Sequence, residues 1–192
     1  MLQQALQPGE LAMETVAVSP FEDIDAVVAE YEPRVFRFLL FAVKDRDVAL
    51  ELTQDTFLNA WRYRAGFRGE CSVATWLMRL AVSLLRSHTR SEKFKFWKKA
   101  SQSAVDAAEV QTALRHRDSS AEERMSARQQ MAQVWDAVET LPQRQKTAFL
   151  LRFVEEMELP EIAAAMQLPL PTAKSHLYRA LDKVRKQAGG LR

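Results

Sequence analysis

Hydrogen-bond donors gather near the C-terminus of the sequence, in a stretch rich in helix-forming residues. They are the hydroxyl, imidazole and cationic side chains of Thr172, Lys174, Ser175, His176 and Arg179. Such groups suit phosphate oxygens and the acceptor-rich edges of purines. Thr172 stands where a helix is expected to begin, and free backbone N–H groups at a helix start bind phosphate. The set indicates contacts with DNA, and the alternative is the solvated outer face of an ordinary helical hairpin.

Charge is distributed unevenly along the chain. Residues 1–33 contain seven acidic residues and neither Lys nor Arg, whereas residues 86–99 contain six cations and one acid. Residues 174–192 are basic as well, although the formal net charge of the whole chain is only +2. Two separated basic segments suit a polyanion that is contacted at two places. Two solvated helix faces remain the alternative at this point.

Patterns typical of catalysis or metal binding are missing from the sequence. Its one cysteine, Cys71, allows neither an internal disulfide nor a Cys-rich zinc site, and we interpret it as a bystander thiol rather than a redox switch. The three histidines have no metal-ligand spacing, and no nucleotide-binding loop or nucleophile–base pair is present. We therefore expect no enzyme activity, no cofactor and no metal.

No apolar run approaches the roughly 20 residues of a membrane span, and the N-terminus is acidic, so we expect a cytoplasmic protein.

The elements that must position these groups are helices. Hydrophobic residues make up 47% of the chain, while 5 Gly and 7 Pro leave little material for turn-rich β structure. Apolar residues at three- and four-residue steps predict a first helix over about residues 21–42. Pro33 is expected to kink or divide that helix.

Two more helices are predicted in the first half of the chain. Asp47 is the expected N-cap of the second helix, which turns Trp61 inward. A short loop follows over residues 66–72, and Ser72 at its end is the expected cap of the third helix. Trp76 lies on the apolar stripe of the third helix, so we assign it to the core rather than to base stacking.

The second half begins after a segment without aromatic residues, 100–119, which we interpret as a linker between domains. Ile162, Ala163 and Met166 would pack against the residues that follow a tight break around Pro169 and Pro171. This spacing sets two short helices at a steep angle, so that the second can enter a major groove of DNA. The predicted helices run over about residues 121–139, 142–153, 159–166 and 172–188.

Both halves resemble one family of transcription proteins. Region four of the sigma-70 family is similar to residues 141–145, 149–152, 161–163 and 172–180. The polymerase-binding helix of region two is similar to residues 52–62, and its promoter-melting segment to residues 67–72 and 75–81. The resemblance covers roughly residues 22–95 and 122–187. With both regions in this order, the chain resembles the extracytoplasmic-function (ECF) sigma factors, which keep only regions two and four.

The resemblance implies an all-α protein of two small helical domains joined by a flexible linker. It assigns sigma region two to residues 21–99 and sigma region four to residues 121–188, while composition predicts a mobile leader (1–20) and the linker (100–120). It also implies three partners: core RNA polymerase through its β′ and β subunits, promoter DNA, and an anti-sigma factor. No insertion into a membrane is expected.

The resemblance further assigns roles to residues of this sequence. The −35 promoter element would be contacted by Thr172, Lys174, Ser175, His176 and Arg179. The −10 element would be contacted by a loop and the exposed side of the following helix, through Phe67, Arg68, Ser72, Arg79, Ser83, Arg86 and Arg90. The core polymerase would be bound by an acidic and polar strip around an apolar contact, formed by Glu51, Gln54, Asp55 and Leu58.

The sequence departs from the family pattern at several positions. Gln167 replaces the usual glycine of the helix-turn-helix turn, so a side chain must be accepted at a demanding backbone position. Pro171, His176, Ser83 and Ser87 also differ from the common residues, which leaves the promoter sequence open. Two other functions remain as alternatives: a stand-alone helix-turn-helix regulator with a sensing N-terminal domain, and a helical adaptor whose basic patches only solubilise it.

Overall fold

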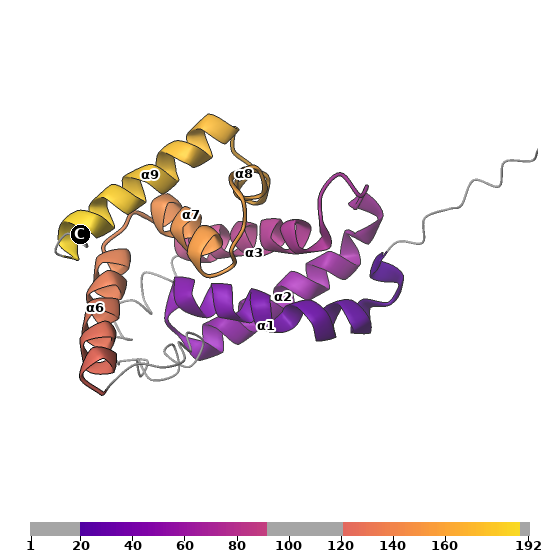
Figure 1. Ribbon diagram of the computed structural model, residues 1–192. Helices are drawn as coiled ribbons and strands as arrows, with labels where there is room; N and C mark the ends of the chain where they lie inside the picture. Colours follow the sequence, from indigo (N-terminus) through magenta and orange to yellow (C-terminus); the bar gives the residue numbers. More distant parts are fainter. Residues whose placement is uncertain (1–19, 92–120, 189–192) are drawn as a thin grey trace, which may run out of the picture.

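The computed structural model describes residues 20–91 and 121–188, and over residues 121–129 it describes the backbone alone. Within these ranges the chain forms α-helices, two short 3-10 helices and no β-strand, which confirms the predicted all-α class. The predicted leader up to residue 19, the end of the basic run and the linker lie outside the described residues. The elements in Figure 1 are η1 (Pro20–Glu22), α1 (Ile24–Val43), α2 (Arg46–Arg62), η2 (Arg64–Gly66), α3 (Val73–Arg90), α6 (Ala121–Glu139), α7 (Gln143–Phe153), α8 (Leu159–Met166) and α9 (Leu170–Gln187).

Polar side chains set the ends of the first two helices. The Asp23 carboxylate accepts a hydrogen bond from a backbone N–H three residues on and starts α1, and Lys44 ends it with a left-handed φ of 57°. Pro33 lies inside α1, which runs past it as one helix, so the predicted division did not occur. The N-cap of α2 is Asp45 rather than the expected Asp47. Asp47 falls in the first turn instead, where a negative charge suits the helix dipole.

The first half is a bundle in which α1 contacts both α2 and α3. Phe38, Leu39 and Leu77 are fully buried between them and form the centre of the apolar core. Ser72 caps α3 as predicted, since its hydroxyl accepts the backbone N–H of Thr75 at 3.1 Å. The bundle therefore fixes where α3 and the loop before it lie.

The second half contains the predicted helix-turn-helix, formed by α8 and α9. Gln167 takes the left-handed conformation with φ of 54°, so the demanding backbone position expected there is present. Ala163 is buried, as the close approach of the two helices requires. The second helix begins at Leu170, two residues before its predicted start. Pro171 is tolerated because the first turn of a helix needs no N–H from it.

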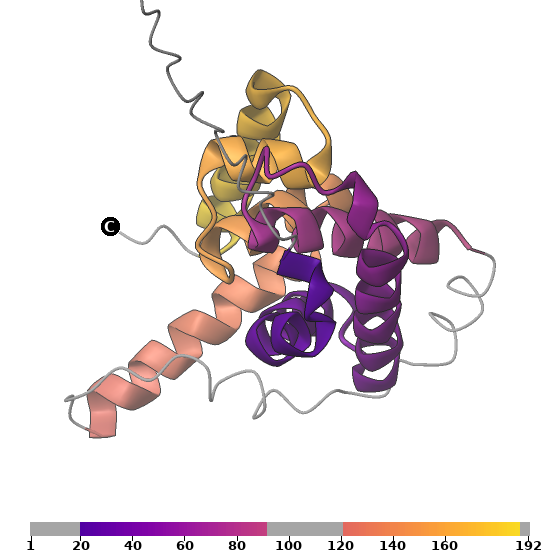
Figure 2. The same cartoon turned by 90° about the vertical axis from the view of Figure 1, so that its right-hand side faces the viewer.

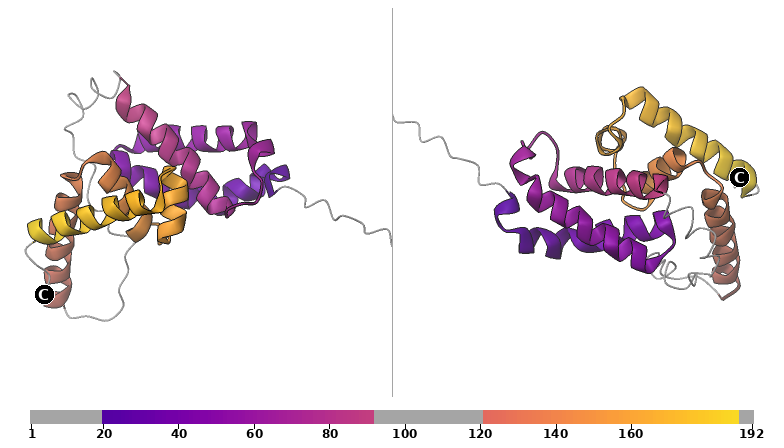
Figure 3. Two further views of the ribbon diagram at one scale, coloured as in Figure 1. Left: turned by 90° about the horizontal axis from the view of Figure 1, so that it is seen from above. Right: turned by 180° about the vertical axis from the view of Figure 1, so that it is seen from behind.

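The two halves pack on each other and share a core. Helix α8 lies against α3, and α7 lies against α1, as Figures 1 and 3 show from several sides. One apolar cluster runs through both halves, joining Phe38 and Leu77 to Leu150 and Ile162. A smaller cluster joins α6, α7 and α9. Figure 2 shows that the N-terminal end of α6 runs out from the rest of the body.

Candidate nucleic-acid interface

Helix α9 presents most of the side chains expected to contact DNA. Lys174 and Arg179 are exposed, and Thr172 and Ser175 are half-buried. Tyr178 is exposed beside them, and the Nζ atom of Lys174 lies 5.8 Å from the centroid of its ring. Cations, hydroxyls and an aromatic ring thus line the helix that could enter a groove of DNA.

His176 differs from the other residues of the predicted set. It is half-buried, and its Nδ1 atom is buried without a hydrogen-bond partner among the described residues. Burial lowers the pKa of His176 below its ordinary value, and the charges of Arg144 and Arg179 lower it further. Burial and the two positive charges therefore all favour the neutral form of the imidazole.

Sequence reasoning missed Arg144, although a signal was available. Arg144 lies in the first turn of α7, where a cation opposes the helix dipole. It is exposed and contributes positive charge to His176 on α9. A cation at this end of α7 is unfavourable for the helix itself. Its place near α9, the helix expected to recognise DNA (the recognition helix), suits a phosphate contact.

The loop before α3 is built around an aromatic cluster of Phe21, Phe67 and Trp76. The Phe67 ring is half-buried and meets Phe21 edge-on at 5.2 Å and Trp76 at 5.5 Å between centroids. Trp76 is buried, in agreement with its assignment to the core. Gly69 has a φ of 71°, a conformation that favours glycine, and Ser72 closes the loop by capping α3.

The polar and basic side chains predicted to contact the −10 element fall into a half-buried group and an exposed group. Arg79 was expected on the exposed side of α3 and is instead half-buried, with a guanidinium N–H donating to the Cys71 Sγ atom at 3.7 Å. The Arg79 Nε atom is buried and has no hydrogen-bond partner among the described residues. Ser83 is half-buried as well. The exposed cations are Arg68, Arg86 and Arg90.

Helix α2 carries the strip predicted to bind the polymerase. Glu51 and Gln54 are exposed, Asp55 is half-buried, and Leu58 is 51% exposed. The prediction that Trp61 faces inward is wrong, because its side chain is 40% exposed. Leu58 and Trp61 are three residues apart and therefore share one side of the helix. Exposed apolar side chains that lie together are common at interaction surfaces, so this pair extends the strip predicted from the sequence.

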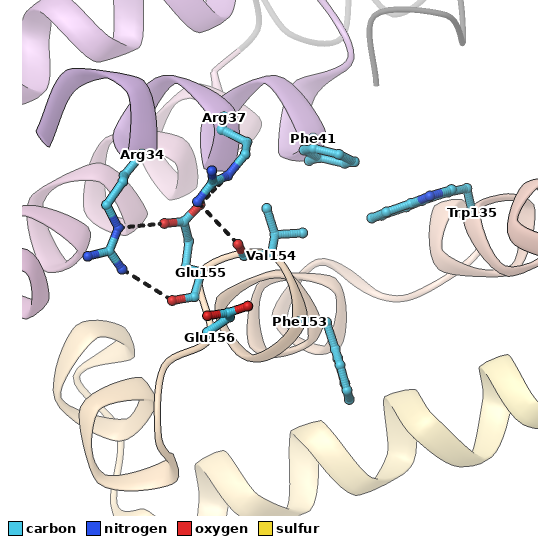
Figure 4. A pocket seen from close by; sticks show the side chains of 8 residues that line it. All are labelled: Arg34, Arg37, Phe41, Trp135, Phe153, Val154, Glu155 and Glu156. Atoms are coloured by element: carbon cyan, nitrogen blue, oxygen red, sulfur yellow. Dashed lines mark hydrogen bonds and ion pairs between the residues drawn. The ribbon is translucent and has the colours of Figure 1, made fainter. Parts of the chain in front are cut away.

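A buried carboxylate joins the two halves, as Figure 4 shows. The Glu155 side chain is fully buried, and its two oxygens accept hydrogen bonds from Arg34 Nε at 3.2 Å and Arg37 Nε at 3.0 Å. Both guanidinium groups also donate to backbone carbonyls, of Glu155 and of Val154. Burial raises the pKa of Glu155 above its ordinary value, although both arginines act in the opposite direction.

Further contacts surround this ion-pair cluster. Thr75 of α3 donates to a Glu161 carboxylate oxygen of α8 at 3.3 Å. Phe41 of α1 stacks on Trp135 of α6 with 4.6 Å between ring centroids. An open pocket of about 510 Å³ lies between α1, α6 and the end of α7, lined by Arg34, Arg37, Phe41, Trp135, Phe153, Val154, Glu155 and Glu156.

A predicted −10 contact residue and the missed Arg144 also meet across the halves. Arg86 of α3 and Arg144 of α7 line one small pocket of about 50 Å³, together with Met166 and Leu168 next to the turn of the helix-turn-helix. Two cations therefore face a shared cavity where the halves join. In this arrangement the α3 surface that leads from the loop is partly covered by α8.

No helix within residues 20–91 and 121–188 combines the length and apolar character needed to cross a bilayer. Over the same residues, no three His, Cys, Asp or Glu side chains are grouped so that they could hold a metal ion.

Comparison with known proteins assigns the two halves. Residues 27–95 match the family Sigma-70 region 2, and residues 131–184 match Sigma-70, region 4. The ECF RNA polymerase sigma-E factor of Haemophilus influenzae is 30% identical over 160 residues, which are 82% of this chain and 83% of that protein. The RNA polymerase sigma-H factor of Pseudomonas aeruginosa is 28% identical over 163 residues, 84% of each chain.

Two solved structures share the fold, and one of them is a sigma factor. The sigma factor RpoE of Bartonella quintana, solved in complex with the anti-sigma factor NepR, matches with a TM-score of 0.58 and 20% identity over 89% of this chain and 99% of that one. CnrH, solved with the cytosolic domain of CnrY, matches with a TM-score of 0.56 and 19% identity over 85% of each chain. These two likenesses are of fold, and the sequence relatives add the family: the chain belongs to the ECF sigma factors of the sigma-70 family.

Proposed function

We propose that the protein is a sigma factor that binds core RNA polymerase and directs the initiation of transcription at specific promoters. The observation that carries this proposal is the presence, in one chain and in order, of the region two helices and the region four helix-turn-helix. Its contribution is recognition and strand opening, with no catalytic step of its own. It acts where polymerase and DNA are, in the cytoplasm.

Promoter recognition is divided between the halves. In region four (121–188), the exposed cations Lys174 and Arg179 of α9 contact the −35 element, with Thr172, Ser175 and His176 beside them. In region two (21–99), the loop of residues 67–72 and the exposed Arg86 and Arg90 contact the −10 element. Base contacts in the major groove supply specificity, and phosphate contacts supply most of the affinity.

Strand opening needs a site for bases that leave the duplex. An unstacked base is stabilised by aromatic stacking and hydrogen bonds in a protein pocket. Phe67, Arg68 and Ser72 offer these groups at the loop, where Arg68 and Ser72 are exposed and Phe67 is half-buried.

Binding to the core enzyme uses α2. Glu51, Gln54 and Asp55 supply acidic and polar groups that suit basic groups on a β′ helix, and Leu58 with Trp61 supplies an apolar anchor.

The halves must separate when the protein works. The −35 and −10 elements are about 25 base pairs apart, which is roughly 85 Å along the duplex at about 3.4 Å per base pair. A folded body of about 140 residues has a radius of gyration of about 14 Å, so it spans only about 40 Å. A chain with α8 packed on α3 therefore cannot contact both elements at once. We call the arrangement in which α8 packs on α3 the closed form, and it is the form of the free or inhibited protein.

An anti-sigma factor is the third partner we propose. The Bartonella quintana sigma factor of the same fold was solved in complex with one. A partner that binds the closed form in preference to the open form would hold the chain inactive, because a ligand shifts an equilibrium toward the state that it binds more tightly.

The decisive experiment is run-off transcription with purified core polymerase on a library of genomic fragments. We expect discrete start sites that appear only when this protein is added. DNA binding without the core enzyme would instead favour a stand-alone regulator, and binding to core without any start site would favour an adaptor.

A further inference from the structure

The aromatic cluster under the −10 loop includes a residue from outside the matched region. Phe21 lies in η1, six positions before the segment that matches Sigma-70 region 2 begins at residue 27. Its side chain is fully buried, and its ring lies 5.2 Å from Phe67 and 4.7 Å from Trp76 between centroids. Since the Phe67 and Trp76 rings also meet at 5.5 Å, the three rings form a closed triangle.

The triangle ties the start of the loop to the body of the protein. Phe67 is the first residue after η2, and its backbone is extended, with φ of −79° and ψ of 109°. The fully buried Phe21 ring packs edge-on against the half-buried Phe67 ring, and Trp76, a residue of α3, contacts both rings. Aromatic contacts of this edge-on kind stabilise beyond the area that they bury.

The other end of the loop is held independently. The Arg79 guanidinium reaches back to Cys71, and the Ser72 hydroxyl caps α3 while also contacting the Thr75 hydroxyl at 2.9 Å. Between the two ends, Arg68, Gly69 and Glu70 are exposed. The loop of residues 67–72 is thus held at both ends, and its exposed middle is accessible to a nucleotide.

We propose that Phe21 is a positioning residue for the capture of an unpaired −10 base. The proposal rests on the proposed function, in which this loop receives the base. Phe21 does not contact DNA. It holds Phe67, and therefore the start of the loop, in position before the base binds. A loop that is already ordered loses less conformational freedom on binding and therefore binds more tightly. Removal of the Phe21 ring is expected to weaken single-strand capture about tenfold while leaving the −35 and polymerase contacts unchanged.

The test compares holoenzymes made with wild type, Phe21→Ala, Phe21→Leu and Val35→Ala. Val35 is the matched control, because it is also fully buried but lies in the middle of α1. The probes come from a promoter recovered by run-off transcription: a fluorescent 12-nucleotide non-template strand of its −10 element, and a duplex that carries only its −35 element. Hydrogen exchange of the backbone amides of residues 67–71 is measured on the same proteins.

We expect Phe21→Ala to bind the single strand about tenfold more weakly than Val35→Ala does, with equal binding to the −35 duplex and to core. Faster exchange confined to residues 67–71 should accompany the loss, and Phe21→Leu should fall between. If Phe21→Ala does not assemble with core, Phe21→Leu must itself show weaker single-strand binding than Val35→Ala and faster exchange confined to residues 67–71. Equal losses in the Phe21 and Val35 variants, or unchanged exchange in the loop, would overturn the proposal. If wild type yields no start site, it is the proposed function that fails, and the exchange result still decides whether Phe21 orders the loop.

Discussion

The Arg37 Nε atom donates to Glu155 Oε1 at 3.0 Å, although the two residues lie 118 positions apart and in different halves of the chain. The pair is unequal: the Glu155 side chain is fully buried, whereas the Arg37 side chain is 37% exposed. If Glu155 is removed, water can solvate the guanidinium of Arg37. If Arg37 is removed, water cannot reach the buried carboxylate of Glu155. The two partners are expected to differ in what their removal costs.

Arg37→Ala should destabilise the packed form more than Glu155→Gln does. The first change leaves a buried carboxylate with one cation instead of two, which costs about 2–4 kcal/mol. The second leaves no buried charge and costs about 1 kcal/mol in hydrogen bonding. Urea unfolding at pH 7, with hydrogen exchange on α3 and α8, measures the difference. Arg62→Ala, a change at an exposed arginine of α2, is the control, and a larger loss for Glu155→Gln than for Arg37→Ala would contradict the account.

Stability should depend on pH through Glu155. Burial raises its pKa above 4.5, so the packed form binds a proton more tightly than the unfolded chain does. The stability that this group contributes is present in full below pH 4.5 and is lost as pH rises through the raised pKa. The advantage of wild type over Glu155→Gln in urea unfolding should therefore be larger at pH 5 than at pH 7. A constant or reversed difference would show that burial does not dominate the titration.

Joining the halves covalently should abolish transcription. Arg86 and Gln143 line one pocket where α3 and α7 meet, and both are exposed. In a Cys71→Ser background, Arg86→Cys with Gln143→Cys can be bridged by a short bis-maleimide. The bridged protein should give no run-off product on a promoter that the unbridged protein transcribes. Each single-cysteine variant treated with the same reagent is the control, and transcription by the bridged protein would mean that the halves need not separate.

Contacts to the −35 element should depend on individual cations of α9. Lys174→Ala and Arg179→Ala are each expected to weaken holoenzyme binding to the upstream duplex by about 1 kcal/mol, or about fivefold, and to make it less sensitive to salt. Lys186→Ala is the matched control, since Lys186 is an exposed cation of the same helix that pairs with Asp182 at 2.8 Å. Core affinity should not change. Normal transcription by both variants across salt concentrations would refute the recognition-helix assignment.

Binding to the core enzyme should depend on the apolar side of α2 as well as on its acids. Trp61→Ala is expected to cost about 2 kcal/mol of core affinity, as large aromatic anchors at interfaces do. Changes at Gln54 and Asp55 should weaken binding to a smaller extent and in a salt-dependent way. Competition against another sigma factor for core polymerase measures both. Met131→Ala on α6 controls for the loss of an exposed apolar side chain, and an equal effect there would remove α2 from the interface.

Local features of the fold could be predicted from the sequence because they depend on neighbouring residues. The Ser72 cap and the burial of Trp76 followed from residue type and spacing, and the left-handed turn at Gln167 followed from the resemblance to the family, which has glycine there. The caps at Asp45 and Asp47 show the limit of this reasoning, because two aspartates two residues apart fit the same role equally well.

The features that were missed depend on residues far away in the chain. Trp61 lies on an apolar stripe, but periodicity cannot say whether a neighbouring helix covers that part of the stripe. Arg79 looked like a free cation, although it folds back onto Cys71. Glu155 attracted no attention, because nothing near it in sequence reveals that Arg34 and Arg37 will reach it across the molecule.

The packing of α8 on α3 also bears on how long the subunit survives between rounds of transcription. Apolar side chains of α3 that line the join, such as Val82 and Leu85, are buried in the closed chain. Parting the halves uncovers them, and proteases and aggregation both act on surface that is transiently uncovered. If the halves part as proposed, a subunit released from polymerase would be protected when α8 packs again on α3, and its turnover in the cell should follow the fraction of time that the halves are apart.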